Sequence, residues 1–176
     1  MKKIIVPLLL IFISACTPSN EEGVAFQEQA NEIFNTNVYI PQYDNLHITS
    51  AIIETGPFGK HKDLIIEYSK QLGDKKDKEF TVKYEKNTGS EVLYGFYDGE
   101  PSVFKLKFND GKGNISPKQI KIINDVKVEY LKMEKRKTLI ASFNVEDGNY
   151  TGEFNLKELS EEKAFKIIEQ IIEETN

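Results

Sequence analysis

The sequence predicts an α+β fold, in which one antiparallel sheet of about eight or nine strands is flanked by an N-terminal and a C-terminal helix. Short runs of alternating apolar and polar residues, separated by turn residues, fill the middle of the chain and indicate strands with one buried face. Apolar residues at helical spacing precede these runs and follow them. The length of 176 residues fits one domain.

The first fifteen residues have the pattern of a signal peptide. Lys2 and Lys3 form a short positive region, and residues 4–13 form an apolar run broken only by Pro7. This run has about half of the ~20 residues that a membrane-spanning helix needs. Residues 1–15 are therefore predicted to be removed.

The end of this run, Ile13-Ser14-Ala15-Cys16, resembles the lipobox of bacterial lipoproteins, in which the cysteine receives diacylglycerol and the signal is cut just before it. The resemblance implies that Cys16 is the lipidation site. It also implies that fatty acids such as palmitate anchor the chain to the extracytoplasmic face of the cell membrane. The alternative is an ordinary secretory signal with a chance cysteine. Cys16 is the single cysteine of the chain, so we expect a fold without a disulfide.

The mature chain is expected to begin with a lipidated tether, residues 16–23, and to continue as one domain over residues 24–176. Ser19 and Glu22 have the spacing of a capping box, which predicts a helix over roughly 20–34. Its apolar face would consist of Phe26, Ala30, Ile33 and Phe34.

A series of strands is predicted after an extended segment, 38–41, in which Pro41 keeps Ile40 out of the helical region. The strand candidates are 46–55, 64–71, 80–84, 92–97, 102–108, 120–123, 126–133, 139–145 and 149–156. The turns between them are expected at 55–59, 73–78, 98–99, 110–113, 124–125, 135–137 and 147–148.

A helix is predicted at the C-terminus. Ser160 suits an N-cap, Glu161 and Glu162 follow where the helix dipole favours acidic residues, and Leu159 can pack on Ala164. We expect its apolar stripe to cover one face of the sheet; the stripe consists of Ala164, Phe165, Ile167, Ile168, Ile171 and Ile172.

No catalytic, metal-binding or cofactor-binding residue is predicted. The two histidines, His47 and His61, lie fourteen residues apart without a cysteine or carboxylate at metal-ligand spacing. Residues 109–115 (NDGKGNI) have the composition of a calcium loop, but Lys112 and Lys121 would occupy ligand positions. The net charge of −5 and the pI near 5.2 argue against a nucleic-acid partner.

Two features leave alternatives open. Seven tyrosines are expected to be half-buried strand residues, and the alternative is that they line a cleft; they are Tyr39, Tyr43, Tyr84, Tyr94, Tyr97, Tyr130 and Tyr150. The lysine-rich stretch 127–137 is expected to be a solvated strand face because Glu129 and Glu134 interrupt it. Its alternative is a contact with anionic lipid headgroups.

Three short motifs in the mature chain carry a family resemblance: Val38-Tyr39-Ile40-Pro41, Tyr150-Thr-Gly-Glu-Phe154, and Leu159-Ser-Glu-Glu162 before an Ile-rich helix. Over residues 25–173 the pattern resembles an uncharacterised domain of Gram-positive lipoproteins and of the extracytoplasmic regions of anti-sigma-factor proteins. The resemblance implies an envelope domain that binds something and carries no known catalytic residue.

The leading hypothesis is therefore a lipid-anchored, non-enzymatic binding or regulatory domain outside the cell membrane, with an envelope protein as its partner. The alternative is a carrier that holds a lipid or other apolar ligand between a curved sheet and the C-terminal helix. A hollow core lined by Phe, Ile and Tyr would favour the carrier, and a packed core the binding domain.

Overall fold

The computed structural model describes residues 21–56, 61–116 and 119–175. In chain order its elements are α1 (Glu21–Phe34), β1 (His47–Thr55), β2 (Lys62–Ser69), α2 (Lys78–Thr88), β3 (Glu91–Gly95), β4 (Ser102–Asn109), β5 (Gln119–Ile123), β6 (Val126–Met133), β7 (Thr138–Val145), β8 (Gly148–Asn155) and α3 (Glu161–Thr175). None of the helices found in these residues is both long and apolar enough to span a membrane. The predicted signal peptide, Cys16 and Ser19 lie outside the described residues.

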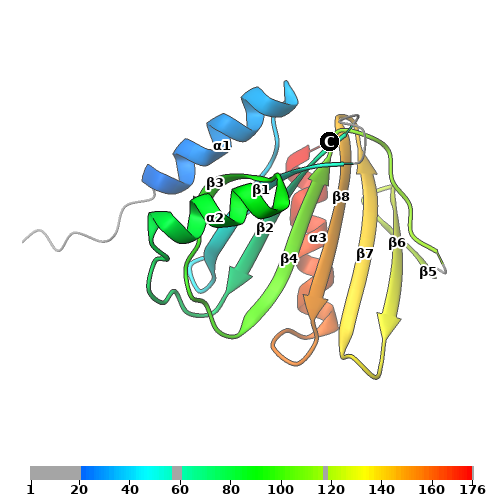
Figure 1. The fold of residues 1–176 in the computed structure, drawn as a ribbon. Helices are drawn as coiled ribbons and strands as arrows, with labels where there is room; N and C mark the ends of the chain where they lie inside the picture. Colours follow the sequence, from blue (N-terminus) through cyan, green and yellow to red (C-terminus); the bar gives the residue numbers. More distant parts are fainter. Residues whose placement is uncertain (1–20, 57–60, 117–118, 176) are drawn as a thin grey trace, which may run out of the picture.

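The strands form one eight-stranded sheet in the order β3-β1-β2-β4-β8-β7-β6-β5 (Figure 1). Every neighbouring pair is antiparallel. The predicted α+β class, the strand number and the two terminal helices are thus confirmed, and a third helix, α2, is added.

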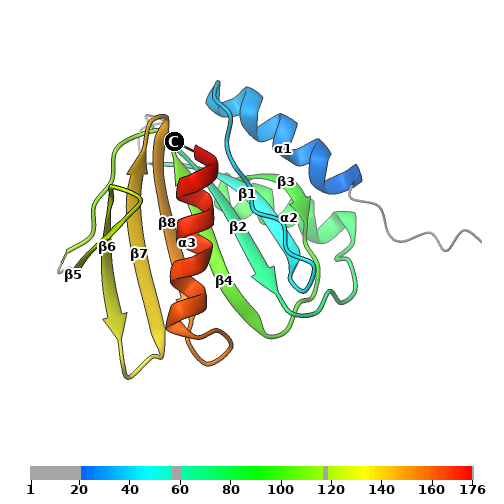
Figure 2. The same ribbon diagram turned by 180° about the vertical axis from the view of Figure 1, so that it is seen from behind.

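One face of the sheet is covered by α3, which lies over β4, β8 and β7 (Figure 2). All six residues of the predicted apolar stripe of α3 are buried. Ser160 caps the helix as predicted, because its Oγ accepts a hydrogen bond from the backbone N–H of Lys163 at 3.2 Å. The predicted face of α1 is also buried at Phe26, Ala30 and Phe34, and these residues belong to the same hydrophobic core.

Stacked aromatic rings fill the centre of this core. Phe104 on β4 lies between Tyr68 on β2 and Phe154 on β8, with ring centroids 4.1 and 5.5 Å away. The Tyr68 hydroxyl donates a hydrogen bond to the carbonyl oxygen of Pro41 at 2.9 Å, so this buried hydroxyl has a hydrogen-bond partner. The alternation predicted for β4 is confirmed here, since Phe104, Leu106 and Phe108 are buried while Lys105 on the opposite face is exposed.

The strand predicted over residues 80–84 is wrong, because this segment belongs to helix α2. The Asp77 side chain accepts a hydrogen bond from the Phe80 N–H at 2.8 Å, and Gly89 ends the helix with a positive φ of 71°. Phe80 and Tyr84 are four residues apart and both contact the Phe96 ring. The helix has no buried residue, so burial left no helical periodicity in its sequence.

The predicted turn at Asp98-Gly99 does connect β3 to β4, but it does not make a hairpin. The two strands are separated in the sheet by β1 and β2. Strand β3 instead pairs with β1, and the chain leaving it is held by bonds from the Tyr97 N–H to the Thr49 carbonyl oxygen (2.9 Å) and from the Gly73 N–H to the Asp98 carbonyl oxygen (2.5 Å).

Gly152 gives a stability prediction at the middle of β8. It lies between Leu106 on β4 and Ala141 on β7, and a Cβ at this position would overlap the ring of the fully buried Phe154. We expect Gly152→Ala to lower the free energy of unfolding by about 1–3 kcal/mol in chemical denaturation, although replacing a strand glycine ordinarily stabilises. The control is Glu153→Ala on the exposed face of the same strand, expected within about 0.5 kcal/mol of wild type. A Gly152→Ala variant that is as stable as wild type would show that the Phe154 ring can move to make room for the methyl group.

Candidate functional site: an open polar sheet face

The face of the sheet opposite α3 carries polar side chains on four adjacent strands. Asp63 on β2 is the register partner of Asn109 on β4, which is the partner of Asn149 on β8, which in turn faces Asn144 on β7. Side chains of one row come to lie together because residues directly opposite each other point to the same face. The result is a polar band across the four central strands, near the starts of β2 and β8 and the ends of β4 and β7.

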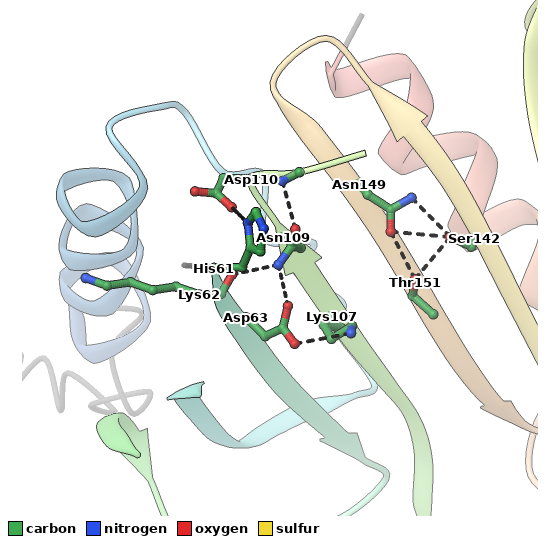
Figure 3. Close-up of polar contacts among 10 residues, drawn as sticks. His61, Lys62, Asp63, Lys107, Asn109, Asp110, Ser142, Asn149 and Thr151 are labelled. Atoms are coloured by element: carbon green, nitrogen blue, oxygen red, sulfur yellow. Dashed lines mark hydrogen bonds and ion pairs between the residues drawn. The ribbon is translucent and has the colours of Figure 1, made fainter. Parts of the chain in front are cut away.

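The β2–β4 part of the band is tied together by charged and amide groups (Figure 3). The Asn109 side-chain amide donates to Asp63 Oδ1 at 2.6 Å, and Lys107 Nζ lies 3.2 Å from Asp63 Oδ2. Asn109 Oδ1 accepts from the Gly111 N–H at 2.7 Å, which fixes the direction in which the chain leaves β4. Asp110 Oδ1 lies 3.7 Å from His61 Nδ1, so this histidine lies at the edge of the band.

The β7–β8 part is a buried cluster of Ser142, Asn149 and Thr151 (Figure 3). The Asn149 Nδ2 donates to Ser142 Oγ at 3.0 Å and to the carbonyl oxygen of Phe143 at 2.9 Å, and Thr151 Oγ1 donates to Ser142 Oγ at 3.1 Å. Ser142 and Asn149 are only 2% and 5% exposed, so these bonds satisfy groups that water does not reach. Amide and hydroxyl partners do not remove a proton from serine, and the cluster therefore has no activated nucleophile.

The connection from β4 to β5 crosses this open face over β8, β7 and β6 (Figure 1). Asn144 holds it in place, because its Oδ1 accepts from the Gly113 N–H at 2.8 Å and its Nδ2 donates to the Gly113 carbonyl oxygen at 3.1 Å. Lys112 Nζ donates to the carbonyl oxygens of Val145 and Glu146. A Cβ at Gly113 would lie 2.7 Å from Asn149 Oδ1, so glycine permits the close approach.

A hollow of about 520 Å³ lies between this connection and strands β6 and β7. A carboxylate, Glu129, lies at its floor with 7% of its surface exposed, and its oxygens contact Lys127 Nζ at 2.9 Å and the Ile115 N–H at 3.2 Å. The lining residues are Lys112, Gly113, Asn114, Asp125, Val126, Lys127, Glu129, Ser142 and Asn144. A hollow with this lining accepts polar groups rather than an apolar ligand.

A second hollow of about 290 Å³ lies on the same face, towards the other end of β4 and β8. Five charged residues border it: Glu67, Lys105, Arg136, Glu153 and Lys157. The two hollows make the open face uneven and charged, in contrast to the apolar face under α3.

The sequence did not predict this face as a site. Its polar residues alternate with core residues along β4, β7 and β8, and alternation alone predicts only a solvent-exposed strand face. A signal that could have indicated a site is the combination of polar positions on those strands with a connection long enough to cross them, residues 110–118.

The histidines considered in the sequence, and the predicted lipidation site, lie as follows. His47 begins β1 as an exposed residue, and His61 lies beside Asp110, so the two histidines do not form a common site. Within the ranges the structure describes, no three His, Cys, Asp or Glu side chains gather to hold a metal ion. Cys16, the predicted lipidation site, lies outside those ranges.

The seven tyrosines do not line one cleft; they belong to several packing contacts. Tyr150 donates to the Tyr39 carbonyl oxygen at 3.1 Å, and Gln170 on α3 donates to the Tyr39 hydroxyl at 3.0 Å, which ties the extended segment to β8 and α3. Burial raises the pKa of Tyr39, Tyr43 and Tyr150 above the usual range. The Tyr43 hydroxyl is buried, and no hydrogen-bond partner for it is found within the described residues.

The lysine-rich stretch 127–137 is paired with carboxylates. Lys127 contacts Glu129, and Lys132 contacts both Glu134 and Glu161 at 3.0 Å. Hydrogen bonds to Glu134 and Glu161 hold the pKa of Lys132 above its usual value, and the hydrogen bond from Lys132 holds the pKa of Glu134 below its usual value. Lys127, Lys132 and residues 134–137 are exposed, as the prediction of a solvated strand face requires, whereas Glu129 is buried. The contact with lipid headgroups stays the alternative prediction.

No protein-family model, curated protein or solved structure matches the chain. The resemblance to an uncharacterised lipoprotein and anti-sigma-factor domain therefore stays a prediction.

Proposed function

We propose that this protein is a lipid-anchored, non-enzymatic binding domain on the extracytoplasmic face of the cell membrane, and that its open polar sheet face binds a partner protein. The observation that carries the proposal is the asymmetry of the sheet. One face is closed by α1 and α3, while the other is covered by α2 only towards its β3 end and exposes the polar band and two hollows on the remaining strands (Figure 1). A partner with polar and charged groups fits such a surface.

The packing of the core supports a binding domain over a carrier. A carrier needs space between the sheet and α3, and the aromatic rings of Tyr68, Phe104 and Phe154 stack there at 4.1 and 5.5 Å. All three side chains are at most 1% exposed. The hollows lie on the opposite face and have polar linings, which an apolar ligand would leave unpaired.

Site-specific photo-crosslinking in intact cells tests the proposal. A photoreactive phenylalanine analogue at Lys105 or Lys127, each exposed beside one hollow, should give one discrete adduct. The matched control is the same analogue at Glu169, which is exposed on the outer side of α3. We expect roughly fivefold or more adduct from the open face than from α3, because a photoreactive side chain reacts only with a partner that lies against it.

Equal adducts from the open face and from α3 would contradict the proposed binding face. Turnover of an ester, peptide or cell-wall substrate that one carboxylate substitution abolishes would contradict the non-enzymatic part of the proposal.

A further inference from the structure

The surface formed by α2 and by the loop before it, residues 70–88, exposes large apolar side chains. Leu72, Phe80 and Val82 are 42%, 42% and 52% exposed. They are three of the five large apolar residues exposed in the part of the chain that is described; the other two, Ile120 and Ile122, lie on the edge strand β5. We call residues 70–88 the α2 surface. Val82 lies on the side of α2 away from Phe96, Phe80 packs on the Phe96 ring, and Leu72 lies in the loop before the helix. Exposed apolar side chains in one region of a surface indicate an interaction site.

The α2 surface is also basic within an acidic protein. It contains six lysines and four carboxylates, while the whole chain carries a net charge of −5. Two of the six lysines, Lys70 and Lys76, contact carboxylates outside the surface, Glu158 at 2.9 Å and Asp98 at 2.6 Å. One of the four carboxylates, Asp77, is the N-cap of α2. Basic side chains beside exposed apolar ones are typical of segments that lie in a membrane interface.

This surface lies next to the N-terminal half of α1. The ring of Phe26 on α1 lies 5.3 Å from that of Tyr94, Tyr94 lies 5.5 Å from Tyr97, and Lys75 Nζ lies 5.3 Å from the centre of the Tyr97 ring. Figures 1 and 2 both show α1 and α2 at the β3 end of the sheet. Cys16 precedes the first residue of α1, Glu21, by five residues, and five residues of chain reach at most about 18 Å.

We propose that the α2 surface contacts the anionic bilayer that holds the lipid anchor. The inference rests on the proposed anchor at Cys16, because a short link from that residue keeps α1 and its neighbour α2 close to the membrane. Val82, on the side of α2 away from Phe96, enters the boundary between headgroups and acyl chains, and the lysines of α2 meet headgroup phosphates. The domain is thereby oriented, and β5 at the opposite edge of the sheet points away from the membrane.

The test uses the lipidated protein, purified from expressing cells and reconstituted into vesicles of phosphatidylglycerol and phosphatidylcholine. Cys16 is the only native cysteine and is blocked by its thioether, so Val82→Cys provides a unique site for a nitroxide label. The matched control is Ile122→Cys, which is 61% exposed on β5. We expect the label at 82 to be at least threefold more accessible to oxygen than to a water-soluble paramagnetic quencher, relative to the label at 122.

Charge is tested separately. In the Val82→Cys background, Lys78→Glu with Lys83→Glu should reduce the lipid contact of the label several-fold, since each basic residue near an anionic surface changes partitioning about fivefold. Vesicles of phosphatidylcholine alone should have the same effect.

The outcomes are distinct. A label at 82 that stays in water while the protein remains on the vesicles overturns the contact and leaves the anchor standing. If the protein purified from cells carries no lipid on Cys16 and does not bind the vesicles, both the proposed anchor and the membrane contact of the α2 surface are overturned. Protection of the label in native membranes but not in pure lipid would assign the α2 surface to a membrane protein and would also overturn the inference.

Discussion

Ile168→Asp is expected to lower the free energy of unfolding by about 3–5 kcal/mol, because it places a carboxylate without a partner in a fully packed site. Ile168 is 1% exposed and lies in the middle of the α3 stripe that closes one face of the sheet. For a domain of this size the change corresponds to a fall of roughly 10 °C or more in Tm. Thermal and chemical denaturation followed by circular dichroism measure it.

The pH dependence identifies the cause. Burial raises the pKa of the introduced carboxyl above its value in the unfolded chain, so the penalty is complete at neutral pH and shrinks as the pH falls towards 4. The control is Glu169→Asp, which places the same side chain at the next, exposed position and should change Tm by a degree or two at most. If the Tm of Ile168→Asp equals that of wild type, α3 is peripheral to the core. The helix would then be better interpreted as an element that binds a partner.

Cys16→Ser is expected to abolish membrane attachment or to leave the signal peptide uncleaved. The thioether to diacylglycerol requires the sulfur, and two acyl chains give stable anchoring because each buried CH₂ contributes about 0.8 kcal/mol. Labelling by a fatty-acid probe should disappear. Processed protein should move from the membrane fraction to the soluble fraction.

Thr17→Ser is the matched control for the anchor, since it makes an equally small change at the neighbouring residue and keeps the sulfur. It should label and fractionate as wild type does. Unchanged labelling of Cys16→Ser would contradict the lipoprotein interpretation. The proposal that the open sheet face binds its partner at the cell membrane would then lose its basis.

Most of the fold could be predicted from the sequence because burial leaves a periodic pattern. The six buried residues of α3 repeat at helical spacing, and β4 alternates between Phe104, Leu106 and Phe108 on one side and lysines on the other. Helix α2 could not be predicted in this way, since it buries no side chain against the sheet. Its end signals, Asp77 and Gly89, were present and are the better guide for a helix on the surface.

The candidate site could not be predicted because it depends on which strands are neighbours. Asn109 and Asn149 are forty residues apart and meet because β4 pairs with β8 rather than with β5. Alternation along a single strand indicates which side chains point away from the core. It does not indicate which polar residues of distant strands become register partners.

The pairing of β4 with β8 also governs when the fold can be completed during synthesis. The strands on one side of this pair, β3-β1-β2-β4, and those on the other, β8-β7-β6-β5, are each continuous in the chain. Either half can form from nearby segments, but their junction must wait until β8 has been made, and α3 follows only afterwards. Joining segments so far apart carries a loop-closure cost, so we expect docking of the two halves to be the slow step of folding. Until then, the edges of β4 and β8 are both open to incorrect pairing.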